Sequence, residues 1–245
     1  VWESEILCIF GRILNHYKVY VVMDTYEHVI PYVPVLDALD LNSQEMVMES
    51  RALRLPIMHN NWQDEFSYTP ITVADLAYSD KGIYCRFWSK GIGLKASYTE
   101  DGGKVHEDSC VEIFLQAPGN EQYINFEFNC VGTCDAARRK SRTESTPLKP
   151  VEYASIRRAT SERPGLIFDR PQGVHSFWVS VFIPFELLGI DLSNPSAPNY
   201  LLGNLYKCGD KTSAPHFLSW KPIDAPHPDF HRPEQFYPIY LAPRQ

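Results

Sequence analysis

Short stretches of alternating apolar and polar residues follow one another along most of the chain beyond residue 70. Such alternation is typical of β-strands that bury one face. It predicts a hairpin of Ile71–Tyr78 and Ile83–Trp88 around a turn at Ser79–Gly82. The same pattern predicts further strands at Cys110–Gln116, Gln122–Val131, Val151–Ala159, Phe177–Ile183, Leu201–Cys208 and His216–Trp220.

Helical signals are few. Asn42 followed three residues later by Glu45 is a capping-box pattern, which predicts a helix from this point to about Leu53. Pro184 before Gly189 predicts one or two further helical turns.

The remaining segments are expected to be loops, notably the glycine-rich residues 91–103 and the basic, solvated residues 135–150. Many short strands with little helix between them favour an all-β fold. We therefore predict an antiparallel β-sandwich of the jelly-roll or immunoglobulin-like type, with a short N-terminal helix and long loops.

The N-terminal residues 1–28 are expected to be an extension to a single β-sandwich domain at 29–245. The first part is apolar but carries charged residues such as Glu3 and Arg12, which a transmembrane helix would avoid. It also lacks the basic start and cleavage site of a secretion signal, which favours a cytoplasmic location. Met23 opens a more ordinary sequence, so our hypothesis is that the residues before it are not native. The alternative is an additional N-terminal strand or helix.

The charge of the chain restricts its partners. Its 245 residues carry a formal net charge of −7 and no basic stripe, which argues against nucleic acid and against an anionic membrane surface. A neutral ligand fits this charge better. The length suffices for one large core, and we expect a monomer.

The cysteines do not have the spacing of a disulfide framework, and several fall within predicted strands. We expect reduced thiols at Cys8, Cys85, Cys110, Cys130, Cys134 and Cys208. The pair Cys130 and Cys134 has no second pair at ligand spacing, so a metal is not expected there. A calcium site built from carboxylates and carbonyl groups has no sequence signature here and stays open.

Two predicted strands share a polar face. Because side chains alternate along a strand, Glu112 lies on one face of its strand and Glu127, Asn125 and Asn129 lie on one face of the next. Three interpretations fit this face: an ordinary solvated surface, a sugar-binding surface, or a glycosidase pair formed by Glu112 and Glu127.

The segment Gly203–Phe236 combines aromatic rings with prolines after Trp220. Prolines at 222, 226, 228 and 233 restrict the backbone, so the segment is expected to follow an extended, ordered path over a surface. Its rings, including Phe217 and Phe230, are more typical of a recognition surface than of a core. Its histidines, His216, His227 and His231, are interpreted as surface or packing residues rather than metal ligands.

Taken in order, four sets of residues resemble the bacterial family 9-like carbohydrate-binding modules over about Val29–Leu241. They are HEDSCVEIF at 106–114, NFEFNCVG at 125–132, NLYKCGD at 204–210, and HFLSW at 216–220 with DFHRPE at 229–234. The resemblance implies a stand-alone β-sandwich that binds a saccharide without cleaving it. In the xylanase-linked modules of that family, two aromatic rings clamp a sugar at a chain end, with structural calcium nearby.

The resemblance also implies a set of ligand-binding residues. Glu112 corresponds to a strand glutamate that bonds sugar hydroxyls, and Glu127 and Asn129 supply further polar contacts. Phe230 takes the place of the second clamp ring, and His106 takes the place of the first, which is normally Trp. Trp220 is expected to support or extend the aromatic surface, and Lys207 to add a hydrogen-bond donor.

We therefore expect a non-catalytic protein that binds a mono- or oligosaccharide and requires no cofactor. One alternative is a glycoside hydrolase or related carbohydrate-active enzyme that uses Glu112 and Glu127. A second alternative is a haem-binding or protein-interaction β-sandwich, since related folds bind haem.

Overall fold

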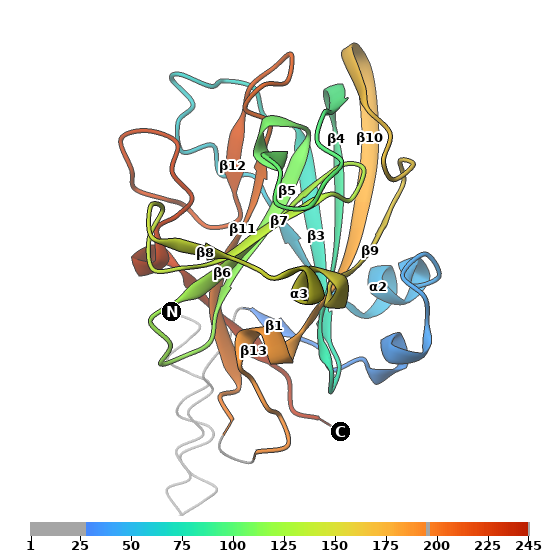
Figure 1. Ribbon diagram of the computed structural model, residues 1–245, viewed down its shortest axis with the longest axis vertical. Coiled ribbons are helices and arrows are strands. Elements are labelled where there is room, and N and C mark those ends of the chain that lie inside the picture. The colour runs from blue at the N-terminus through green and yellow to red at the C-terminus, as the bar shows by residue number, and fades with distance from the viewer. Residues whose placement is uncertain (1–27, 195–196, 245) are drawn as a thin grey trace, which may run out of the picture.

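The alternating segments form two sheets that face each other in the computed structural model, which describes residues 28–194 and 197–244 (Figure 1). The hypothesis that the chain before Met23 is not native falls outside the described residues. In the larger sheet the strands lie in the order β1 (Val29–Ile30), β13 (Tyr237–Leu241), β11 (Tyr200–Cys208), β5 (Cys110–Gln116), β6 (Tyr123–Asn129), β7 (Cys134–Arg139) and β8 (Ser145–Pro147). The short strand β12 (Phe217–Ser219) pairs with β11.

The second sheet has the order β2 (Leu53–Pro56), β3 (Ile71–Tyr78), β4 (Gly82–Ala96), β10 (Phe168–Pro184) and β9 (Arg157–Thr160). Pairing is antiparallel in both sheets except between β1 and β13, which run parallel. The predicted antiparallel sandwich is thereby confirmed. Among the described residues, no helix is long and apolar enough to cross a membrane.

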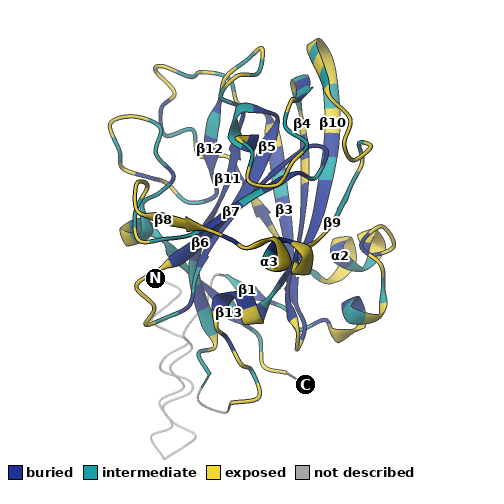
Figure 2. Cartoon of the chain, in the orientation of Figure 1, coloured by how far each residue is buried: buried dark blue, intermediate teal, exposed yellow. Residues whose placement is uncertain are grey.

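The main core lies between the sheets, where the strands are coloured as buried in Figure 2. One face of β5 and β6 contributes Val111, Ile113 and Phe126, and β4 and β10 contribute Phe87 and Val181 from the other sheet; each is at most 1% exposed. A second apolar cluster covers the opposite, outer face of the larger sheet, and it includes Trp62, Phe114, Tyr206 and Phe230. Both faces of β5 and β6 are thus covered, so the solvated-surface interpretation of the polar face is wrong.

The helix predicted from Asn42 is shorter than expected. Helix α2 spans Glu45–Arg51, is preceded by the 3-10 helix η1 (Pro34–Ala38), and has no side-chain cap. The Asp40 carboxylate accepts hydrogen bonds from the Asn42 and Ser43 amides and forms a turn there instead of a capping box. The turn removes Asn42 from the helix start.

The strand predicted over Val151–Ala159 is wrong in its first half. Helix α3 spans Pro150–Ser155, and β9 begins at Arg157. Pro150 suits a first helical turn, and the Glu152 side chain accepts a hydrogen bond from the Lys149 amide at 2.7 Å. These local signals outweigh the apolar residues that suggested a strand.

Two predicted loops also contain strands. Strand β4 continues through residues 91–96, paired with the start of β10, and Gly93 allows the backbone its positive φ of 71° beside the register shift in that pairing. Residues 135–150 contain most of β7 and all of β8. The other short helices are η2 (Val105–Glu107), η3 (Phe185–Leu188) and η4 (Pro233–Gln235).

Candidate functional site

A pocket of about 240 Å³ opens on the outer face of the larger sheet, between its strands and the C-terminal segment. The volume is below the range of drug-sized ligand pockets and suits a small ligand. Its lining is rich in ionisable groups and comprises His106, Glu112, Glu127, Asp135, Arg139, Arg142, Cys208, Asp210, Phe217, Pro228, Asp229, Phe230 and His231.

Three carboxylates form a row across the floor. Glu112 on β5 is directly opposite Glu127 on β6, which in turn is directly opposite Asp135 on β7. Residues opposite each other on neighbouring strands place their side chains on the same face of the sheet. Strand pairing therefore holds the Glu112 and Glu127 carboxyl groups side by side, and the two residues are only 2% and 4% exposed.

The pKa values of Glu112 and Asp135 are raised in this row. Burial, with the neighbouring Cys208 and Glu127, raises the pKa of Glu112 well above its ordinary value. Burial and the Glu127 carboxylate also raise the pKa of Asp135, to about 6. Burial and like charges held this close both disfavour ionisation of the Glu112 carboxyl group.

The polar contacts of Glu127 leave one of its carboxylate oxygens without a hydrogen bond. Its Oε1 accepts a hydrogen bond from the Asn125 side-chain amide at 2.9 Å, and Asn125 is fixed in turn by Arg139. Its Oε2 lies 3.7 Å from Nδ1 of His106, which is an ionic contact too long for a hydrogen bond. Among the described residues this buried Oε2 has no hydrogen-bond partner. The Glu127 carboxylate also raises the pKa of His106.

Aromatic rings form one side of the pocket. Phe230 stacks on Tyr206, with ring centroids 4.2 Å apart and planes 10° from parallel. The backbone that carries Phe230 is held against the sheet because Trp62 donates a hydrogen bond to the carbonyl of Ala225 at 2.8 Å. The proline-rich segment after Trp220 therefore covers part of the outer face of the larger sheet.

His231 is a half-buried packing residue at the edge of the pocket. Its ring stacks on Phe114 at 5.0 Å, and its Nδ1 shares a hydrogen bond of 2.9 Å with the Tyr123 hydroxyl. Burial lowers the pKa of His231 to about 4, so the ring is neutral at physiological pH.

Four of the residues predicted to bind ligand line this pocket: His106, Glu112, Glu127 and Phe230. Lys207 does not, because it is opposite Val111 on β5 and therefore faces the inner side of the sheet. Its ammonium group donates to Nε2 of His216 at 2.8 Å, and the side chain is buried away from the pocket. The expected role of Lys207 as a ligand donor does not fit this position.

Asn129 and Trp220 also lie outside the pocket lining. The Asn129 amide donates to the Tyr98 carbonyl and to Asp108, and its oxygen accepts from the Thr133 amide, so its bonds hold the turn after β6. Trp220 packs in the inner core, 4% exposed, rather than beside Phe230. The alternation of side chains along β6 correctly predicted that Asn129 shares a face with Glu127. Asn129 is, however, the last residue of the strand, and its side chain bonds the turn that follows.

Several lining residues were missed by sequence reasoning. Asp135 and Arg139 were assigned to a solvated loop, but they lie on β7, next to the carboxylate strands. Asp210 follows β11 and lies near His106, whose carbonyl accepts its amide at 3.0 Å. Recognising residues 134–139 as a strand, in which two alanines follow Asp135, would have placed Asp135 beside Glu127.

The described cysteines Cys85, Cys110, Cys130, Cys134 and Cys208 are all free thiols and buried. Cys8 lies outside the described residues. For the structural calcium that the resemblance implies, the described side chains offer no cluster of three carboxylates close enough to share an ion.

The fold and this pocket define a β-sandwich with a small, polar pocket on the outer face of one sheet. The model of the family described as "Carbohydrate-binding family 9" matches residues 42–241, which is most of the chain, and the chain belongs to that family. The predicted family relationship is confirmed. A search of curated proteins finds no match.

Solved structures agree with this assignment. A protein from Bacteroides uniformis, described as a candidate carbohydrate-binding protein, is 26% identical, with a TM-score of 0.79 over 87% of this chain and 98% of that one. A family 9 carbohydrate-binding module from Caldicellulosiruptor kristjanssonii in complex with glucose is 13% identical, with a TM-score of 0.54 over 89% of this chain and 95% of that one. A structure described as such a module from the same organism in complex with cellotriose is 12% identical, with a TM-score of 0.56 over 89% of this chain and 94% of that one. The last two show the fold alone.

Proposed function

We propose that the protein binds one sugar ring of a mono- or oligosaccharide in this pocket and does not cleave it. Family membership supports a carbohydrate ligand. The neighbouring carboxyl groups of Glu112 and Glu127 suit adjacent sugar hydroxyls, each of which donates and accepts hydrogen bonds. The pocket of about 240 Å³ suits a single ring, such as the end of a chain.

The free oxygen of Glu127 is the observation that carries this proposal. A buried acceptor without a partner costs about 1 to 3 kcal/mol, so a native protein rarely keeps one unless a ligand or water satisfies it. Glu127 Oε2 lies in the pocket lining and has no such partner among the described residues. A sugar hydroxyl would donate a hydrogen bond to it, and the adjacent Glu112 carboxyl group would bond a neighbouring sugar hydroxyl.

Phe230 and His106 supply the flat surfaces for the sugar ring. Phe230 is held rigidly by its stacking on Tyr206, which reduces the entropy lost on binding. The His106 side chain is 40% exposed and lies against Glu127, so an imidazole replaces a second aromatic clamp. This pair offers less aromatic area than two Trp rings, and we expect modest affinity.

The arrangement of the carboxyl groups favours binding over hydrolysis. A glycosidase places an acid and a second carboxylate on either side of the scissile bond. Glu112 and Glu127 are instead neighbours on one rung of the ladder, both buried and facing the same way, so they contact the same side of a ligand. The hydrolase alternative predicts turnover, which the experiment below measures.

Isothermal titration calorimetry with glucose, cellobiose and cellotriose tests the proposal. We expect millimolar to micromolar binding of at least one sugar by the wild-type chain, weakened at least about tenfold by Glu127→Ala, because the acceptor is lost. Glu121→Gln is the matched control, since Glu121 carries a carboxylate of the same length that is 82% exposed outside the pocket.

Unchanged affinity in folded Glu127→Ala would remove the pocket as the binding site. Release of reducing sugar from the same oligosaccharides, abolished by Glu127→Gln, would overturn the non-catalytic part and favour a glycoside hydrolase.

A further inference from the structure

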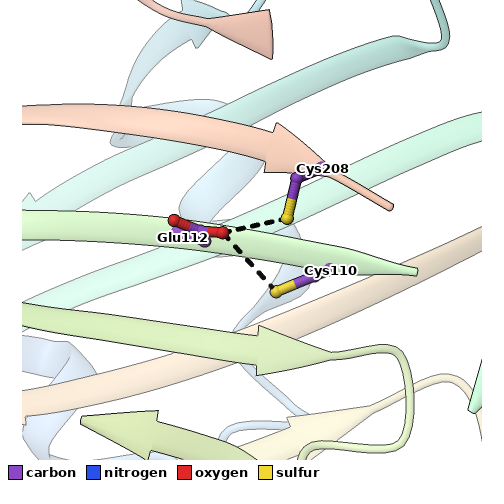
Figure 3. Close-up of side chains that lie close together, drawn as sticks. All are labelled: Cys110, Glu112 and Cys208. Carbon is purple, nitrogen blue, oxygen red and sulfur yellow. Dashed lines mark hydrogen bonds between the residues drawn. The ribbon is translucent and has the colours of Figure 1, made fainter. Parts of the chain in front are cut away.

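Two thiols and a carboxyl group converge at the floor of the pocket. Cys110 and Glu112 are two residues apart on β5 and so share its outer face, and Cys208 on β11 is directly opposite Cys110. Figure 3 shows both sulfur atoms directed at the same carboxylate oxygen of Glu112. The distances to that Oε1 are 2.9 Å from Cys208 Sγ and 3.9 Å from Cys110 Sγ.

The geometry points to a site for a soft or borderline divalent cation, of which zinc is the main biological example, bound by Cys110, Cys208 and Glu112. This inference goes beyond saccharide binding and does not depend on it. One ligand atom from each residue lies within 4.8 Å of the other two, and no other such group of His, Cys, Asp and Glu occurs in the described part of the chain.

The spacing fits a metal ion. Zinc bonds of about 2.3 Å to sulfur and about 2.1 Å to oxygen place tetrahedral ligands roughly 3.5 to 3.8 Å apart. The two distances measured to Glu112 fall on either side of this range. All three ligand atoms lie within 4.8 Å of one another, so rotations of the side chains would bring them to an ion between them.

The ligand types decide which metal. Thiolates select zinc and related soft cations, whereas calcium and magnesium require oxygen ligands. Two sulfur atoms and one carboxylate match the three protein ligands of an open zinc site, which keeps its fourth position for water or another small ligand. On binding, the ion displaces the two thiol protons and any proton on the Glu112 carboxyl group to solvent, and the ligands become two thiolates and a carboxylate.

The site also has an entry path and an open side. Cys208 and Glu112 line the pocket and Cys110 does not, so an ion can enter from solvent through the pocket and bind at its floor. The unpartnered Glu127 Oε2, on the residue opposite Glu112, is a buried acceptor for a water held by such an ion. The three ligands sit on paired strands, which hold them more rigidly than loops would.

The test uses the full-length chain, reduced with a phosphine, freed of metal by chelation and titrated with Co²⁺ in the absence of saccharide. We expect one equivalent to give a thiolate-to-cobalt charge-transfer band, which Zn²⁺ then removes by displacement. Cys110→Ala and Cys208→Ala should each weaken Co²⁺ binding by at least about 100-fold. Cys130→Ala is the matched control, since it also deletes a buried thiol but leaves the three ligands intact.

A second measurement needs no variant. Zn²⁺ bound to the wild-type chain should protect Cys110 and Cys208 from alkylation during partial unfolding, as read by peptide mass spectrometry, and leave Cys130 and Cys134 unprotected. Absence of the charge-transfer band in the folded, reduced chain would overturn the site, as would protection confined to other cysteines. Because saccharide affinity is measured separately by calorimetry without metal, either proposal can fail while the other holds.

Discussion

Glu112 and Glu127 are directly opposite each other on β5 and β6, and both are almost fully buried under a covering segment from the C-terminal part of the chain. The strand ladder forces two acids together that would separate in water. Burial, with the neighbouring Cys208 and Glu127, raises the pKa of Glu112, and one oxygen of Glu127 has no hydrogen-bond partner among the described residues. The predictions below follow from this arrangement and from the residues that support it.

Asp135→Asn should stabilise the protein at neutral pH and have little effect at pH 4. The pKa of Asp135 is raised to about 6 in the folded state from 3.8. The folded state therefore binds this proton more tightly than the unfolded state does. The contribution of Asp135 to the free energy of unfolding is most favourable below about pH 4 and is lost as the pH rises through about 6. The shift corresponds to at most about 3 kcal/mol, less after solvent screening. Urea unfolding at pH 4, 5, 6 and 7 measures it; an equal effect at every pH would contradict the electrostatic cause.

Glu127→Gln should lower the pKa of His106. The Glu127 carboxylate is the main cause that raises this pKa, and burial acts against it. Removing the charge leaves burial dominant. A titration of the imidazole protons by nuclear magnetic resonance follows the change, with the exposed Glu121→Gln as control. A His106 titration that is the same in both variants would mean that the two side chains do not interact in solution.

Trp62→Phe should weaken saccharide binding although Trp62 does not line the pocket. Trp62 donates a hydrogen bond to Ala225, and this bond ties the segment that carries Phe230 to the sheet. Phe keeps most of the ring but cannot donate, at a cost of about 1 kcal/mol in the free energy of unfolding. Calorimetry and thermal unfolding report the two effects. Wild-type saccharide affinity in this variant would show that the segment does not need this bond.

Arg139→Met and Lys207→Met should differ in their effect on saccharide affinity. Arg139 lines the pocket and donates to Asn125, which in turn bonds Glu127, so its loss should weaken binding by about tenfold. Lys207 faces the inner side of the sheet and bonds His216, so affinity should stay within about twofold of wild type. A larger loss of affinity in folded Lys207→Met would contradict the assigned pocket.

The sequence by itself determined the fold class, because strand alternation and the family motifs are local patterns. They can be read within one segment without knowing which strands pair with each other. It also placed Glu112 and Glu127 on one face, because a strand alternates its side chains with a period of two. The same rule could have excluded Lys207 from the site, since it lies between Tyr206 and Cys208, which face the outer cluster.

Only the tertiary structure decided what covers that face. Whether a polar face is wet or buried depends on a segment about a hundred residues away, and its path is set by contacts such as that of Trp62 with Ala225. Pairing between distant strands also brought Asp135 beside Glu127, and Cys208 beside Cys110. Strand register is a relation between two segments, so no pattern within either one contains it.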